Sequence, residues 1–126
     1  MENQTQYNPG RRAHQRFTAV DRALVHLDLG SESLPYHIMD ISKGGLSFRY
    51  LGEKLRHSKA KKASLYHNSK LIIDNLSVAT VSDYHLRDNL VPVRRGSVFF
   101  KEMSSEQSSQ LETFIQKFTE VPLPAV

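Results

Sequence analysis

The stretch LPYHIMDISKGGLSFRY, at residues 34–50, consists of two apolar-rich runs on either side of a tight turn. The first run, residues 34–41, and the second, residues 46–50, each have the length of a short strand. Between them, residues 43–45 contain two consecutive glycines, which accept positive φ angles at little cost and so favour a sharp reversal. The stretch therefore predicts a β-hairpin.

Further runs with strand character lie on both sides of this hairpin. Upstream, residues 19–29 alternate in part between apolar and polar side chains. A basic, irregular segment at 52–62 precedes the remaining predicted strands, which span 63–67, 71–73, 76–84 and 90–101. Turn signals separate the strands at Gly30-Ser31, Asn68-Ser69 and residues 87–89. Short strands at turn-spaced intervals are typical of an antiparallel sheet or barrel.

The C-terminal part of the chain changes to a helical pattern. Ser104 and Gln107 have the spacing of a capping box, which marks the start of a helix. An apolar stripe with helical spacing follows, made of Leu111, Phe114, Ile115 and Phe118. We expect this stripe to pack on the barrel and close an open end, as ordinary core rather than as a partner-binding face.

Length and composition favour one small domain. The chain has 126 residues and no cysteine, which excludes disulfides and thiolate metal sites. No apolar run approaches the roughly 18 residues of a membrane span, and residues 1–9 lack the apolar core of a signal peptide. We therefore expect a cytoplasmic protein with a disordered tail at 1–10, a folded domain at 11–120 and a second tail at 121–126.

Signatures of catalysis are missing from the sequence. The six histidines have no metal-ligand spacing, and no serine lies in a G-x-S-x-G setting. The carboxylates form no acid–base pair pattern, and Gly44-Gly45 is too short for a phosphate-binding loop. The interpretation is a protein that is not an enzyme and that uses neither a metal nor a cofactor.

Two short motifs together carry the functional signal. An R-x-x-x-R segment at residues 12–16 lies just ahead of the first strand, and a D-x-S-x-x-G segment at residues 40–45 lies at the hairpin turn. Each alone is common, because Asp, Ser and Gly all favour turns. In this order and strand setting, they resemble the motifs of the PilZ domain, a bacterial receptor module for the second messenger cyclic di-GMP. The resemblance extends from Arg11 to Phe118.

The resemblance implies a mainly β fold, a six-stranded antiparallel PilZ-like β-barrel with a C-terminal α-helix. It also implies that the chain binds cyclic di-GMP through residues of the two motifs, namely Arg12, Arg16, Asp40, Ser42 and Gly45. Gly44 could share the task of Gly45, and Arg11 could touch a second, stacked copy of the ligand, or be only a solvated charge.

Arginine and carboxylate chemistry suits a guanine dinucleotide. An arginine fork matches the O6 and N7 acceptors of guanine, and it can also clamp a phosphate. A carboxylate accepts hydrogen bonds from guanine N–H groups. Arg94 and Arg95 are candidates for a further contact at the rim, although a solvated strand edge is the simpler interpretation. The chain has no tryptophan, so any stacking surface must come from Tyr or Phe.

The expected mechanism is an order change. Ligand would fold residues 11–16 onto the barrel, and the new surface would signal to an unidentified downstream protein or close a homodimer. A second hypothesis is a PilZ-like protein–protein adaptor of motility, pilus or secretion machinery that works without nucleotide. A third is a single-stranded nucleic acid binder, which ranks lower because the aromatic residues are few and scattered.

Overall fold

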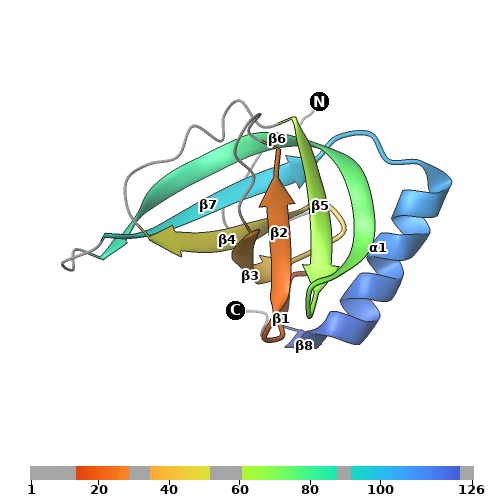
Figure 1. Ribbon diagram of the computed structural model, residues 1–126, viewed down its shortest axis with the longest axis horizontal. Coiled ribbons are helices and arrows are strands. Elements are labelled where there is room, and N and C mark those ends of the chain that lie inside the picture. Colours follow the sequence, from red (N-terminus) through yellow and green to blue (C-terminus); the bar gives the residue numbers. More distant parts are fainter. Residues whose placement is uncertain (1–13, 29–34, 52–60, 88–91, 123–126) are drawn as a thin grey trace, which may run out of the picture.

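The folded part of the chain is almost entirely antiparallel strand, with one helix near its C-terminal end (Figure 1). The computed structural model describes residues 14–28, 35–51, 61–87 and 92–122. The elements, in chain order, are β1 (Phe17–Ala19), β2 (Ala23–Leu27), β3 (Pro35–Ile41), β4 (Gly45–Leu51), β5 (Lys62–His67), β6 (Lys70–Arg87), β7 (Val93–Phe100), α1 (Ser105–Phe118) and β8 (Thr119–Pro122).

Six strands close into a barrel. They follow the order β2-β5-β6-β7-β4-β3, and pairing of β2 with β3 returns to the start. Apolar side chains alternate into the interior; in β2, for example, Ala23, Val25 and Leu27 are buried while Leu24 and His26 are only partly so. The sequence-based prediction of a six-stranded antiparallel barrel with a C-terminal helix is therefore confirmed.

The hairpin at the two glycines forms as predicted. β3 and β4 pair from His37 opposite Arg49 to Ile41 opposite Leu46. The other edge of β3 is shared by two strands. β2 pairs with its beginning, and β1 pairs with its end, where Phe17 lies opposite Ile41. This arrangement places the start of β1 beside the hairpin turn.

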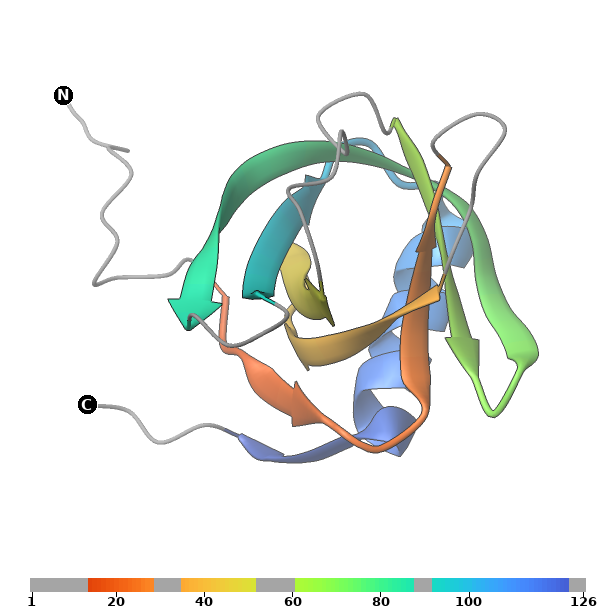
Figure 2. The ribbon, with the colours of Figure 1, turned by 60° about the vertical axis from the view of Figure 1, so that its left-hand side comes forward.

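Two strand predictions were wrong in their boundaries. Residues 71–73 and 76–84 form one strand, β6, which bends around the barrel in Figures 1 and 2. The predicted break is a β-bulge at Asn75, which has a φ of 59° and whose amide donates to Ser64 Oγ at 3.3 Å. Conversely, the predicted strand at 19–29 is two strands, which follow each other along the same edge of β3 and are separated by a turn at Arg22, with a φ of 68°.

The helix has its predicted cap and apolar stripe. Ser104 Oγ accepts the Gln107 amide at 3.0 Å, and the Gln107 side chain accepts the Ser104 amide at 3.1 Å. The stripe residues Leu111, Phe114 and Ile115 are buried in the barrel core. Figure 2 looks into the barrel from the end that faces away from α1, and α1 runs across the far end.

The chain does not become irregular directly after the helix. Thr119 leaves the helical conformation and begins β8, which pairs with β1. This strand was not predicted, and its last two residues belong to the segment that the sequence analysis assigned to a tail. In the described part of the chain, no helix is long and apolar enough to cross a membrane.

Candidate functional site

The two sequence motifs meet on the outside of the barrel. Arg16 directly precedes β1, and the pairing of Thr18 with Asp40 brings the two strands together there. The Nε atom of Arg16 donates to Oδ1 of Asp40 at 3.0 Å, across 24 positions of sequence. The Nη2 atom of Arg16 contacts the same carboxylate oxygen. The arrangement is a close ion pair between one residue of each motif.

A second arginine holds the other side of the carboxylate. Arg95 Nη2 donates to Asp40 Oδ2 at 2.7 Å and to Ser47 Oγ at 2.9 Å. Asp40 is only 8% exposed, and Ser47 is buried. A buried charge needs such partners, because losing its hydration is costly. Two guanidinium groups around one carboxylate leave one positive charge in excess at this place.

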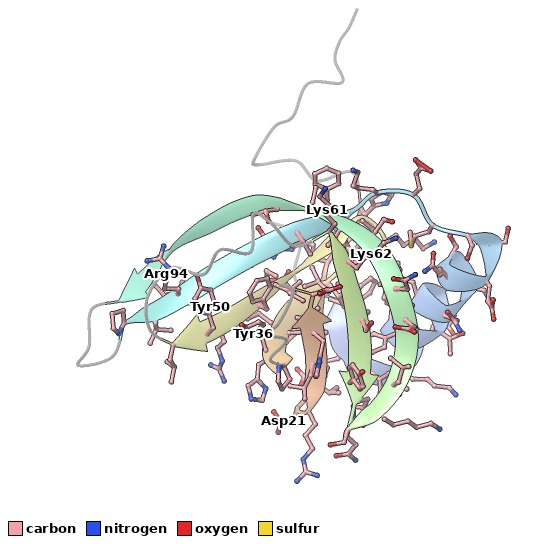
Figure 3. All side chains as sticks on the ribbon, turned by 45° about the horizontal axis from the view of Figure 1, so that its top comes forward. Asp21, Tyr36, Tyr50, Lys61, Lys62 and Arg94 are labelled. Atoms are coloured by element: carbon pink, nitrogen blue, oxygen red, sulfur yellow. The ribbon has the colours of Figure 1, made fainter. Side chains whose placement is uncertain are left out.

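Sequence analysis did not assign Arg95 to the site, and it treated Arg94 and Arg95 alike. The structure separates them, because successive side chains of a strand point to opposite faces. Arg94 Nε donates to the hydroxyl of the buried Tyr50 at 3.2 Å. Figure 3 shows Arg94 and Tyr50 together at the end of the barrel away from α1. Arg95 instead faces Asp40 on the outside.

Ser42 ties the hairpin turn to itself. Its hydroxyl accepts the Gly44 amide at 3.0 Å and lies 3.4 Å from the Gly45 carbonyl, to which it can donate. The Ser42 amide donates to the same carbonyl at 2.8 Å. These bonds are the local kind that Ser favours in turns. The side chain is half-buried, and the turn that it stabilises lies next to Asp40.

The two glycines are needed for space and not for backbone freedom. The expectation of positive φ angles at this turn was wrong, since neither glycine lies in the left-handed region. A Cβ on Gly45 would lie 2.3 Å from the Val98 carbonyl oxygen of β7. A Cβ on Gly44 would lie 2.8 Å from Cδ2 of His14. His14, which lies within the R-x-x-x-R segment, therefore makes a second contact between the motifs.

Three points of the sequence analysis remain: two further arginines, an aromatic side chain for stacking, and a metal site. Arg11 and Arg12 lie outside the described residues. Phe99 is an exposed aromatic side chain, at 45%, and it lies on β7 directly opposite Gly45. Where the structure describes the chain, no group of three or more His, Asp or Glu side chains could hold a metal ion.

The chain was compared with known proteins. No family model matches it, and neither does any curated protein. Solved structures do match. The PilZ domain of YcgR from Escherichia coli, solved with c-di-GMP, aligns at a TM-score of 0.66 and 16% identity, over 86% of this chain and 91% of that one. This chain has a PilZ-like fold.

Two further structures align in the same way. MrkH, described as a c-di-GMP-dependent transcription regulatory factor, matches at a TM-score of 0.64 and 18% identity over 84% of this chain. MotI of Bacillus subtilis, an inhibitor of motility, matches at 0.62 and 14% over 85%. The PilZ-like chain spans 50% of the length of each of these two proteins. At such identities the likeness establishes the fold, and function has to be argued from the site.

Proposed function

We propose that this chain is a receptor for cyclic di-GMP, which binds on the outer face of the barrel at Arg16, Asp40 and the Ser42 turn. The observation that carries the proposal is the ion pair between Arg16 and Asp40, because it joins the two motifs at one place. Arg11 and Arg12 would complete the arginine set. The proposal is also supported by the fold, since the YcgR PilZ domain and MrkH were solved with c-di-GMP.

The chemistry of the face fits an anionic purine dinucleotide. Arg16 and Arg95 together leave one positive charge in excess beside Asp40, and this charge favours the binding of phosphate. An arginine fork can also bond guanine or stack on it. Asp40 would accept guanine N–H groups, and Ser42 would keep the turn in shape beside it. The backbone of β7 packs closely against Gly45. We therefore assign Gly45 to the fold of the site and not to a ligand contact.

At Arg16, the proposed response to ligand differs from the simple ordering of a segment. Arg16 already lies on Asp40 without ligand. Ligand would therefore make Arg16 exchange one anionic partner for another, while the residues ahead of it join the site. The changed surface would then engage a downstream protein or a second copy of the chain. The proposed receptor has no catalytic role.

Isothermal titration calorimetry tests this function. Purified protein is titrated with cyclic di-GMP, and GTP and cyclic di-AMP serve as ligand controls. Saturable heat with cyclic di-GMP alone is the expected result. The variant Lys70→Gln is a matched control, because it removes one positive charge from the exposed end of the β5–β6 hairpin and should bind as the wild type does. A flat titration at high protein concentration would reject the receptor and favour the nucleotide-independent adaptor.

A further inference from the structure

The Asp40 carboxylate bonds two arginines, and these two arginines are held in the fold in different ways. Arg95 lies within the eight-residue strand β7, whose backbone pairs with β4 at Arg49 and with β6 at Tyr84. Arg16 precedes β1, a strand of three residues. Arg95 is thus part of the closed barrel, whereas Arg16 lies ahead of a short strand that pairs with the edge of β3.

Separate oxygens of the carboxylate serve the two arginines. Arg16 occupies Oδ1, and Arg95 occupies Oδ2 while also bonding Ser47. Because the sets of bonds do not overlap, Arg16 can leave without disturbing those of Arg95. The side chains are poorly exposed, at 18% for Arg16, 11% for Asp40 and 21% for Arg95, so a carboxylate left without any cation would be strongly disfavoured.

We propose that Arg95 is a positioning residue, the permanent counter-ion of Asp40 that frees Arg16 to bind an anionic guanine dinucleotide. Arg95 keeps the carboxylate fixed in position and pointed outward in both states. With Arg95 absent, Arg16 would be the one cation left on Asp40 among the described residues, and a ligand would have to pull it from a buried charge. This inference rests on the proposed function, because the ligand is the one proposed there.

Calorimetry of Arg95→Gln with cyclic di-GMP measures the effect on binding. The expected result is weakening on the order of tenfold or more relative to the wild type, whereas Lys70→Gln binds normally. Arg95→Lys restores the charge and should recover part of the loss. Unchanged affinity in Arg95→Gln would overturn the inference while leaving the receptor function intact.

A second experiment needs no ligand. Chemical unfolding is measured for Arg16→Ala, Arg95→Gln and the double variant, each with Asp40 and with Asp40→Asn. The double variant should lose more stability than the two single losses added together, since only it strips Asp40 of both cations. In the Asp40→Asn background the losses should be small and additive. A structural role unrelated to the carboxylate would give the same losses in both backgrounds.

The two experiments separate the possible failures. A flat wild-type titration overturns the proposed function, and with it the ligand part of this inference; the counter-ion role then depends on the unfolding cycle alone. Additive losses in the Asp40 background overturn that role directly. Where Arg95→Gln does not fold, Arg95→Lys takes its place: because lysine keeps the positive charge beside Asp40, this variant should keep part of the binding, and a complete loss of binding in folded Arg95→Lys counts against the counter-ion role.

Discussion

Asp40 shows how one side chain can serve both the fold and the site. It lies in β3, between cations from β7 and from the segment ahead of β1. The hairpin turn could be predicted from residues 40–45, because its bonds are local. The contact with Arg95 could not, since it spans 55 positions and depends on the register of three strands. The one available signal was the alternation of side chains between the two faces of β7. It places Arg95 and Arg94 on opposite faces, but it does not show which residue Arg95 contacts.

Replacement of Arg16 should affect binding far more than stability. In Arg16→Ala we expect cyclic di-GMP binding to be lost, because a motif arginine is gone. The unfolding free energy should fall by less than about 1 kcal/mol, since Arg95 still neutralises Asp40 through its other carboxylate oxygen. Calorimetry and thermal unfolding of the same sample check both. A much larger loss of stability would assign Arg16 to the fold.

Gly45 and Gly44 make a matched pair at the turn. In Gly45→Ala the new methyl group meets the backbone of β7, which cannot move without disturbing the barrel. We expect a loss of about 1–3 kcal/mol in urea unfolding. In Gly44→Ala the methyl group meets only the exposed side chain of His14, which can turn away, so the loss should be clearly smaller. Equal losses would contradict this account.

The elements that form from local signals were the ones that sequence analysis placed well. The hairpin turn at Asn68-Ser69 forms with positive φ angles at both residues, and α1 begins at its capping box. By contrast, the continuity of β6 depends on β5, whose Ser64 hydroxyl lies at the bulge and bonds Asp74 and Asn75. β8 depends on β1 in the same way. Such pairings join distant residues and leave no local pattern.

The cap of α1 also joins the helix to the barrel. The Gln107 side chain, beyond its capping role, donates to the carbonyl oxygens of Asp74 and Asn75 at 3.0 and 3.2 Å. Ser104→Ala should therefore destabilise the protein by about 1 kcal/mol, through loss of the cap and weaker positioning of Gln107. Ser108→Ala, in the exposed face of the same helix, is the control and should be close to neutral in thermal unfolding.

At the scale of the whole molecule, the barrel and helix share one core, so unfolding should be a single transition. A ligand that binds only the folded state then stabilises all of it. Cyclic di-GMP at 100 times its dissociation constant should add about 2.7 kcal/mol to the unfolding free energy. Differential scanning calorimetry checks this, with GTP as the control ligand. Equal melting temperatures with and without cyclic di-GMP would contradict binding to the native state.

β1, the shortest of the described strands, joins the barrel to β8 and to the end of α1. β1 has three residues; Arg16 stands at one end of it, and at the other end the Val20 amide donates to the carbonyl of Phe118, the last residue of α1. Its two edges bond the strand of Asp40 and the strand that follows the helix. One strand of three residues therefore connects Arg16, at the candidate site, to the C-terminal end of α1.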